Sequence, residues 1–420
     1  MRFVRKTVLL AISAFILLAE LGCGDQYRPV ANPVISPGGQ PQSTHFAWVL
    51  NNNSGGGDGS VTELDVSGDT SLSVNSMGVG SISEAFPGFS LSLYVANSGD
   101  DTVNQYLPTL AGAITTISLL PGSHPIALTS TTTSAMYVLN QGFNSACQTT
   151  GSISIISTAT LSVSSTTCVG HNPTAMVQSP TNGFIYIINQ GDNNISVFNP
   201  AGPNVTGIVT PPTGTNLGST PASLAVNAQG WVFVVAQGQG SNPGTLVVIA
   251  AGFTNIAGTS PLGVNPTYAF IDPNRNRLYV TNSGDNSVSV FDASSVTQGS
   301  NTAVRLLAKV AVGTQPTSVT ALLDGTNFYV ANAGSSDVTV VSQSSFTPLS
   351  SVPLPAGALP VWIASDPTSA KVYVADSGTF ETTIIQTSNN TVTQNIQSPL
   401  QNPNCTSSCP LQTPVMILTQ

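Results

Sequence analysis

Short runs of alternating apolar and polar residues recur along most of the chain. The segment "LYVTNSGDNSVSVFD" at 278–292 contains two such runs, separated by a polar turn with Gly and Asp. Similar segments stand at 93–107, 185–199 and 328–342. β-Branched and aromatic residues that alternate with small polar residues, bounded by Gly, Pro, Asn and Asp, are typical of short strands. Long apolar runs of helical period are missing after the N-terminus, so the pattern predicts an all-β protein.

One aromatic position marks the period of this repeat. Aligning the segments on it gives eight copies, spaced 43 to 50 residues apart, at Trp48, Tyr94, Tyr137, Tyr186, Phe233, Tyr279, Tyr329 and Tyr373. Repeats of this length that consist of strands and turns, without helices, are typical of the blades of a β-propeller. The sequence therefore predicts a β-propeller over residues 44–420, with eight blades as the first choice and seven as the alternative.

Each repeat divides into four strand segments. In residues 265–312 these segments are "NPTYAFID", "RLYVTN", "SVSVFD" and "LLAKVAVG", which predicts a four-stranded meander for each blade. The turn between the second and third segments is "SGDN", in which Gly284 is expected to supply the backbone angles of a tight hairpin. A calcium site at Asp100, Asp192 or Asp285 is disfavoured, because each turn offers too few oxygen ligands.

The two ends of the repeat region complement each other. The region begins with "HFAWVLNN" at 45–52, which matches a second strand, and finishes with "TPVMILTQ" at 413–420, which matches a first strand. Pairing of the C-terminal strand with the N-terminal three would complete one blade and remove two open sheet edges. The sequence thus predicts a ring that is closed by its last strand.

The N-terminal segment has the features of an export signal. Three basic residues precede an apolar run from Val8 to Ala19, which is too short to cross a bilayer as a helix. The run leads into "AELGC", which resembles the lipobox of bacterial lipoproteins. We therefore expect removal of residues 1–22 and lipidation of Cys23, with cleavage without lipidation as the alternative. Residues 23–43 are then a lipidated cysteine and a flexible tether, which would hold the protein at a membrane of the cell envelope, facing the periplasm or the surface.

The low charge of the chain limits the classes of partner. Only 6% of the residues are charged, against about 25% in an ordinary soluble domain. Removal of residues 1–22 takes away three of the nine basic residues and one of the eighteen acidic ones, which leaves a side-chain charge of −11. No cluster of Lys and Arg is present to neutralise phosphates, so nucleic acid is not expected as a partner. We expect a monomer that binds an envelope protein or a polysaccharide.

The five cysteines divide in a way that fits an oxidising compartment. Cys147 lies in the loop between the second and third strands of its repeat, and Cys168 ends the fourth strand. Both places lie on the same face of a meander, so a disulfide between them is reasonable. Cys405 and Cys409 would form a short local bridge, although four cysteines allow three pairings. A zinc site at Cys405 and Cys409 lacks further ligands.

Residues suited to catalysis are scarce. After residue 22 the chain has three Glu and three His, namely Glu63, Glu84, Glu381, His45, His124 and His171. The GxSxG and HExxH motifs do not occur, and neither does GxGxxG between a strand and a helix. The sequence predicts no catalytic residue, no metal and no cofactor, and an enzyme is the less favoured class.

The residues before the inner-strand prolines form the candidate binding face. They are expected to ring one mouth of the central channel, and they are His124, His171, Asn172, Asn265 and Gln315. Because His124 and His171 fall at nearly equivalent positions of adjacent repeats, a shared metal or anionic ligand is the alternative to ordinary loop histidines.

Short motifs link the repeat to a known family. Tyr-Val-Thr-Asn at 279–282 has near matches at 94–97, 137–140, 329–332 and 373–376, and Val-Gly-x-x-Pro stands at 169–173 and 312–316. With these motifs the chain resembles the YVTN β-propeller repeat family. The resemblance implies an exported, periplasmic or cell-surface propeller, usually with seven blades. A neighbouring family, the lactonase-type propellers, includes hydrolases of sugar-acid lactones.

Three functions fit these observations. The first is a non-enzymatic, lipid-anchored scaffold that binds an envelope protein or a polysaccharide, because a stiff disc with variable loops suits that task. The second is a lactonase-like hydrolase, although a shared fold does not carry an activity with it. The third is a structural component of a surface layer or wall.

Overall fold

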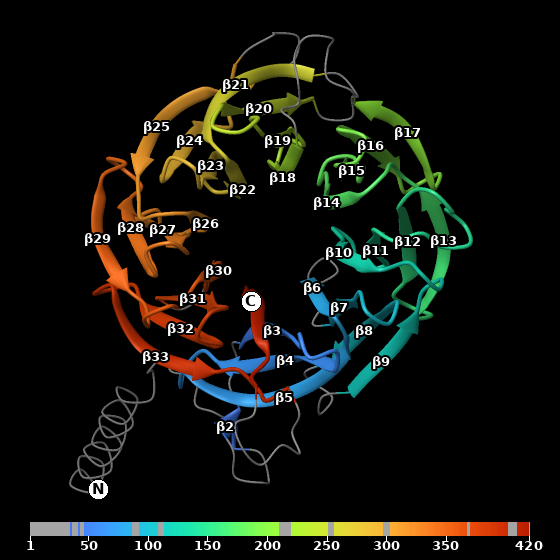
Figure 1. The fold of residues 1–420 in the computed structure, drawn as a ribbon, viewed down its shortest axis with the longest axis horizontal. Helices are drawn as coiled ribbons and strands as arrows, with labels where there is room; N and C mark the ends of the chain where they lie inside the picture. Colours follow the sequence, from blue (N-terminus) through green and yellow to red (C-terminus); the bar gives the residue numbers. More distant parts are fainter. Residues whose placement is uncertain are drawn as a thin grey trace, which may run out of the picture.

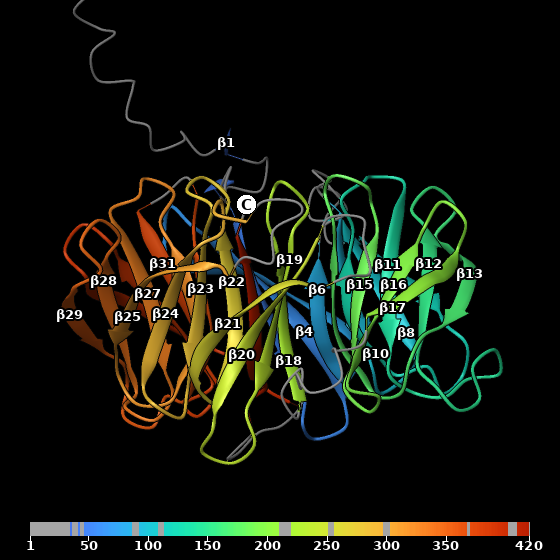
Figure 2. The same cartoon turned by 90° about the horizontal axis from the view of Figure 1, so that it is seen from above.

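The computed structural model describes residues 34–35, 41–42, 46–85, 92–107, 113–209, 220–250, 256–296, 303–367, 370–401 and 410–419. This part of the chain contains strands and turns but no helix, and hence no helix that is long and apolar enough to cross a membrane. Eight four-stranded antiparallel sheets are arranged in a ring (Figure 1). Seen from the side, the ring is a disc in which each sheet forms one blade (Figure 2). The fold is an eight-bladed β-propeller, so the first choice of the sequence analysis is confirmed.

The strands of each blade follow one another from the inside of the ring outward. In this order, blade 1 consists of β34 (Thr413–Thr419), β3 (Phe46–Asn52), β4 (Asp58–Asp65) and β5 (Thr70–Val79), and blade 2 of β6 (Ser81–Ala85), β7 (Leu93–Asn97), β8 (Thr102–Leu107) and β9 (Ala113–Ser118). Blade 3 consists of β10 (Pro125–Thr129), β11 (Ala135–Asn140), β12 (Ser152–Ser157) and β13 (Ser162–Cys168). Blade 4 consists of β14 (Pro173–Gln178), β15 (Ile185–Asn189), β16 (Asn194–Asn199) and β17 (Asn204–Val209).

Blade 5 consists of β18 (Thr220–Val226), β19 (Val232–Gln237), β20 (Pro243–Ile249) and β21 (Ile256–Val264), and blade 6 of β22 (Pro266–Asp272), β23 (Arg277–Asn282), β24 (Ser287–Asp292) and β25 (Arg305–Ala311). Blade 7 consists of β26 (Pro316–Ala321), β27 (Asn327–Asn332), β28 (Asp337–Ser342) and β29 (Pro348–Pro353). Blade 8 consists of β30 (Pro360–Ser365), β31 (Lys371–Asp376), β32 (Glu381–Gln386) and β33 (Thr391–Gln397). Two short strands before the ring, β1 (Val34–Ile35) and β2 (Pro41–Gln42), pair with each other.

The last strand of the chain closes the ring, as the sequence predicts. β34 pairs antiparallel with β3, with Leu50 opposite Met416 and Asn52 opposite Thr413. Blade 1 therefore combines the C-terminal strand with three strands from the start of the repeat region. This pairing gives blade 1 four strands, like the other seven blades, and covers the edge of β3.

The recurring aromatic position fills the space between neighbouring blades. All eight aromatic side chains lie on the second strand of a blade and are at most 7% exposed. Tyr279 of blade 6, for example, contacts Phe328 of blade 7 with ring centroids 4.8 Å apart, in a cluster that includes Val319. The first letter of the tetrapeptide motif is thus explained by packing between blades.

The last letter of the motif, Asn, is a buried hydrogen-bonding anchor. In blade 6, Asn282 is fully buried; its Oδ1 accepts from the backbone N–H of Gly263 at 3.0 Å. Its Nδ2 donates to the hydroxyls of Ser287 and Ser289 on the third strand, at 3.1 and 3.0 Å. The side chain therefore joins two strands of one blade to the connection from the blade before it.

The turn aspartate continues this anchor. Asp285 Oδ2 accepts from the backbone N–H of Val264 at 3.1 Å, and Asp100 accepts from Val79 in the same way in blade 2. The recurring Asn-x-Gly-Asp therefore satisfies backbone donors of the connection between blades, which supports the interpretation as turn chemistry.

The predicted role of Gly284 is wrong. The positive backbone angle of this turn falls two residues later, at Asn286, with φ 55°, and Asp101 and Asn193 take the equivalent place in other blades. Gly284 is required for another reason: a Cβ atom there would lie 2.7 Å from Val264 Cγ1 and 3.0 Å from the Val264 carbonyl oxygen. The turn needs a glycine because it packs tightly against the connection between blades.

A disulfide joins Cys147 to Cys168, the pairing expected from the sequence, with Cα atoms 5.4 Å apart. Cys23, Cys405 and Cys409 lie outside the described residues.

Reduction of the Cys147–Cys168 disulfide is expected to lower the free energy of unfolding by about 3 kcal/mol, the chain-entropy value for a loop of this length. Urea denaturation with and without reductant measures the difference. The double variant Cys147→Ser/Cys168→Ser is the control and should not respond to reductant. Equal midpoints for the oxidised and reduced wild type would contradict the prediction.

Candidate functional site

Four of the five residues of the predicted binding face share an unusual backbone conformation. Asn172, His124, Asn265 and Gln315 have φ of 45°, 46°, 48° and 51°. Each directly precedes the proline that begins an inner strand, and the pairing of that strand shifts register just after the proline. These residues therefore lie at the start of the inner strands, beside the turns that join second to third strands.

Hydrogen bonds hold the two histidines to separate turns. His124 Nδ1 lies 2.8 Å from the carbonyl oxygen of Ser98, and its backbone N–H donates to Asp101 Oδ1 at 2.7 Å. His171 Nδ1 lies 2.7 Å from Asp192 Oδ1. Within the described ranges, no group of three or more His, Cys, Asp or Glu side chains is placed to hold a metal ion. Each imidazole thus has a structural partner of its own.

The amide side chains of this face also bridge loops. Gln141 Nε2 donates to Asn172 Oδ1 at 2.9 Å, which ties blade 3 to blade 4, and Asn265 Nδ2 donates to Ser283 Oγ at 2.7 Å. The Gln315 backbone N–H donates to Asn286 Oδ1 of the preceding blade at 3.0 Å. The predicted binding face is therefore also a row of contacts between neighbouring loops.

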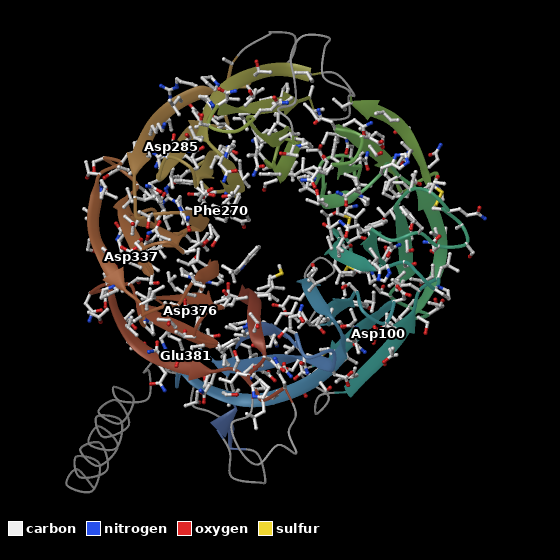
Figure 3. The ribbon with its side chains drawn as sticks, viewed as in Figure 1. Asp100, Phe270, Asp285, Asp337, Asp376 and Glu381 are labelled. Carbon is white, nitrogen blue, oxygen red and sulfur yellow. A yellow bond between two sulfur atoms is a disulfide. The ribbon has the colours of Figure 1, made fainter. Side chains whose placement is uncertain are left out.

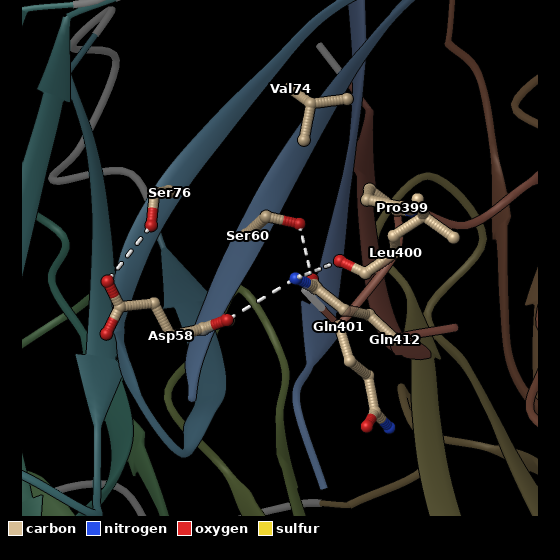
Figure 4. Close-up of a pocket in the computed structure, with 9 residues that line it drawn as sticks. Asp58, Ser60, Val74, Ser76, Pro399, Leu400, Gln401 and Gln412 are labelled. Carbon is tan, nitrogen blue, oxygen red and sulfur yellow. Dashed lines mark hydrogen bonds between the residues drawn. The ribbon is translucent and has the colours of Figure 1, made fainter. Parts of the chain in front are cut away.

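A cavity of about 560 Å³ lies at the seam where the ring closes (Figure 4). Gln412, in the connection before β34, forms much of its wall: its Oε1 accepts from Ser60 Oγ at 2.6 Å, and its Nε2 donates to the Asp58 carbonyl oxygen at 3.3 Å. These bonds fasten the connection to blade 1. The seam cavity is therefore part of the closure, and the same connection contains residues 402–409, which lie outside the described residues.

A second cavity, of about 340 Å³, lies among the inner strands of blades 6, 7, 8 and 1, and we call it the aromatic pocket. Its walls come from the later residues of β22, β26, β30 and β34 and from the turns that follow. It therefore opens at the end of the inner strands opposite to the predicted binding face. None of its lining residues carries a charge. Figure 3 shows one of them, Phe270, at the inner edge of blade 6.

Three aromatic side chains and three hydroxyls characterise the aromatic pocket: Tyr268, Phe270, Trp362, Thr320, Ser365 and Thr419. The rings of Tyr268 and Trp362 meet edge to face, with centroids 5.5 Å apart. Trp362 Nε1 donates to the carbonyl oxygen of Ile417 on the closing strand at 3.0 Å. The Thr320 and Ser365 hydroxyls lie 3.0 Å apart, and Thr419 Oγ1 donates to the Ser365 carbonyl oxygen at 2.9 Å.

Burial raises the pKa of Tyr268 to about 12. Its hydroxyl therefore stays protonated at physiological pH, and it can donate a hydrogen bond without adding charge to the pocket.

The register of the inner strands shows why the pocket forms at this place. In each inner strand, one residue is the first to pair with the second strand after the shift in register. From blade 1 to blade 8 this residue is Met416, Ser83, Ala127, Ala175, Ser223, Tyr268, Ser318 and Trp362. Large rings in blades 6 and 8 thus flank a serine in blade 7. This pocket is not among the predictions from the sequence, although the aromatic residues in "PTYAFID" and "PVWIAS" are a signal for it.

Two acidic side chains are buried inside the ring. Asp376 takes the anchor position that is Asn in blade 6, and burial raises its pKa to about 7, against the hydrogen bond from Thr383. Glu84 on β6 is 1% exposed, and burial raises its pKa well above the usual range; an interaction with the Leu418 backbone amide opposes this shift. Neither Glu84 oxygen has a hydrogen bond of regular geometry among the described residues. These carboxyls lie in blades 8 and 2, which are not neighbours in the ring.

Asp376→Asn is expected to stabilise the protein at neutral pH. In the wild type the folded state keeps a proton on Asp376 up to about pH 7, whereas the unfolded chain loses it near pH 4. Stability is therefore lost as the pH rises through this window, and the gain of the variant should grow by about 2 kcal/mol from pH 5 to pH 7. Urea denaturation at both pH values measures it, and Asn332→Asp in blade 7 should acquire a similar pH dependence. A gain that does not change with pH would refute the prediction.

Comparison with known proteins establishes the fold and no more. No family model matches the chain, and no curated protein matches it. Among solved structures, the dihydro-heme d1 dehydrogenase NirN in complex with DHE has a TM-score of 0.65 and 11% identity over 88% of this chain and 74% of its own.

Two further solved structures are similar. Apo AztD from Citrobacter koseri has a TM-score of 0.60 and 11% identity over 90% of this chain and 99% of its own. Hydrazine synthase of Kuenenia stuttgartiensis has a TM-score of 0.53 and 20% identity over 69% and 90%. These neighbours are β-propellers, and at such identities they support the fold alone.

Proposed function

We propose that this protein is a non-enzymatic, lipid-anchored scaffold of the bacterial cell envelope that binds a polysaccharide or an envelope protein. The observation that carries the proposal is the aromatic pocket, which is built from aromatic rings, aliphatic side chains and hydroxyls without any charged lining residue. Such a lining favours binding by packing and hydrogen bonds. General acid–base catalysis needs a titratable group within reach of the substrate, and the lining has none near neutral pH.

The placement of the other titratable groups agrees with this proposal. Glu63 accepts hydrogen bonds from Tyr106 and Ser73, Glu84 is buried between blades 1 and 2, and the turn aspartates bind backbone amides. A lactonase-like hydrolase would need several such groups at one accessible place. The residues that the structure describes do not gather them.

The cellular location is proposed from the sequence. Export and lipidation at Cys23 would place the propeller on a tether in the envelope, as a monomer of the YVTN type without affinity for nucleic acid. The Cys147–Cys168 disulfide supports an oxidising compartment. Labelling of cells with a palmitate analogue tests the anchor: the wild type should be labelled, and Cys23→Ser should not be.

Cross-linking in intact cells tests the scaffold function. The captured protein should carry a polysaccharide or one reproducible envelope protein, and the purified protein should not turn over a panel of sugar lactones. Lactone turnover would refute the proposal. Links only between copies of this chain would also refute it, because they would indicate a structural layer.

A further inference from the structure

We infer that the aromatic pocket is a binding site for an uncharged sugar unit of a polysaccharide, with Trp362 as the main contact surface. The inference rests on the proposed binding function and names the ligand class. A pyranose ring has an apolar C–H face and a rim of hydroxyls, so it needs an aromatic surface beside hydrogen-bonding groups. The pocket provides both, since Trp362, Tyr268 and Phe270 lie beside the hydroxyls of Thr320 and Ser365.

The main aromatic surface is held in place before any ligand binds. The Trp362 indole is fixed on one side by its hydrogen bond to Ile417 and on another by the edge-to-face contact with Tyr268. A side chain that is already ordered loses little conformational entropy on binding. This preorganisation distinguishes Trp362 from an aromatic residue on a mobile loop.

The hydroxyls are also ordered. Thr320 and Ser365 contact each other across the boundary between blades 7 and 8, and Thr419 binds the Ser365 backbone from blade 1. Ser365 Oγ also donates to the Ala321 carbonyl oxygen at 3.2 Å, and Thr320 Oγ1 accepts from the Ser365 backbone N–H at 3.2 Å. A hydroxyl has one donor and two lone pairs, so each of these two oxygens keeps a lone pair for a ligand. The hydroxyls on the rim of a sugar can donate to these lone pairs, which matches this set.

The uncharged lining and the negative charge of the protein disfavour charged glycans. The lining has no Lys or Arg to pair with a carboxylate, sulfate or phosphate, and the whole chain carries a formal charge of −9. An anionic polysaccharide would be repelled by the protein and find no ion partner in the pocket. The lining also has no carboxylate for an amino sugar with a free ammonium group. The pocket therefore fits a neutral sugar.

The size of the pocket fits a short stretch of chain. Its volume of about 340 Å³ lies at the lower end of the range of ligand pockets, roughly 300–1,000 Å³. Blade 7, between the two blades that contribute aromatic rings, lines the pocket with Val319, Thr320, Ala321 and Leu323, whose side chains are all smaller than an aromatic ring.

Intrinsic tryptophan fluorescence tests the inference directly. Of the three tryptophans, Trp48 and Trp231 are only 2% and 9% exposed, so a change of emission on binding reports on Trp362. The purified mature protein is titrated with four probes: cellohexaose, maltohexaose and chitohexaose, which are neutral, and hexagalacturonate, which is anionic. We expect at least one neutral probe to change the emission, and hexagalacturonate to have no effect.

Variants locate the site. Trp362→Ala should weaken binding of that probe by roughly tenfold or more, the effect of removing a central aromatic contact, with calorimetry replacing fluorescence as the readout. Trp362→Phe keeps a ring and should retain part of the affinity. Val361→Ala, on the same strand but outside the pocket lining, is the matched control and should bind like the wild type. Circular dichroism and the melting temperature verify that each variant is folded.

Three results would overturn the inference: no binding of any neutral probe, binding of hexagalacturonate alone, or equal binding of a neutral probe by folded Trp362→Ala and the wild type. The proposed function has a separate failure. If no probe binds but one envelope protein is cross-linked in cells, the scaffold proposal holds and the sugar site is wrong, whereas lactone turnover refutes the scaffold itself.

Discussion

Glu84→Ile is expected to raise the free energy of unfolding at pH 8 by about 3–5 kcal/mol, the range measured for an uncompensated buried charge. Glu84 is 1% exposed and lacks a hydrogen bond of regular geometry among the described residues. The equivalent positions of the seven other inner strands are all apolar: Leu128, Met176, Leu224, Ala269, Val319, Ile363 and Ile417. Isoleucine would restore the residue type that the rest of the ring uses.

The gain from Glu84→Ile should depend on pH. Burial raises the pKa of Glu84 in the folded state, whereas the carboxyl of the unfolded chain ionises near pH 4.3. Below about pH 4 both states are protonated and the gain is small. Above that pH the unfolded wild type is favoured by ionisation, so the gain of the variant grows.

Chemical denaturation at pH 4 and pH 8 measures this difference. Glu84→Gln is the matched control, because it keeps the shape and polarity of the side chain and removes its titration. The Gln variant should gain stability only at the higher pH. A variant that is less stable than the wild type at pH 8, or a gain of equal size at both pH values, would contradict the account.

Deletion of residues 413–420 is expected to prevent folding into a monomeric propeller. The deletion removes β34 and leaves the backbone groups along β3 unpaired, which promotes association with other chains. It also removes Ile417, which is 1% exposed and packs in a cluster with Tyr373 and Ala375 of blade 8.

A point variant gives the same test on a folded protein. Ile417→Ala should lower the free energy of unfolding by about 3 kcal/mol, within the range for large-to-small changes in a core. Leu349→Ala on the outer strand β29, where Leu349 is 56% exposed, should change it by less than about 0.5 kcal/mol. Melting curves and size-exclusion chromatography are the measurements. A truncated chain that is monomeric and melts like the wild type would show that β34 does not close the ring.

Most of the fold was predictable from the sequence because the same four-strand pattern recurs eight times. Alternation of period two indicated the strands, and the spacing of the aromatic residues indicated the blades. The mismatch between the two ends indicated the closing strand. The disulfide followed because both cysteines were placed on one side of a single meander.

The details of the turns were not predictable from residue preferences. Gly284 was expected at the positive φ, but the structure uses Asn286 there and requires Gly284 for its close approach to Val264. Leu359 and Phe380 have φ of 48° and 59°, although neither residue type favours that conformation. Leu359 lies in the connection from blade 7 to blade 8, and Phe380 lies in the turn between the second and third strands of blade 8, at the place of Asn286 in blade 6.

The site was less predictable than the fold. The sequence pointed to the residues before the inner-strand prolines, whereas the aromatic pocket lies at the other end of those strands. Tyr268 and Trp362 are far apart in the chain, in blades 6 and 8, and only the closed ring brings their side chains into contact. Glu84 was one of three glutamates after residue 22, and its burial became evident only from its position on β6.

Equilibrium dialysis with chemical analysis of the retained sugar shows whether the protein binds a neutral sugar without converting it. The purified protein is dialysed against the neutral hexasaccharides and a set of sugar lactones, and each compound is then recovered and identified by mass spectrometry. We expect a neutral oligosaccharide to be retained and recovered unchanged, and every lactone to be recovered intact. Hydrolysed products in the presence of the protein, or the absence of retention of any neutral sugar, would contradict it.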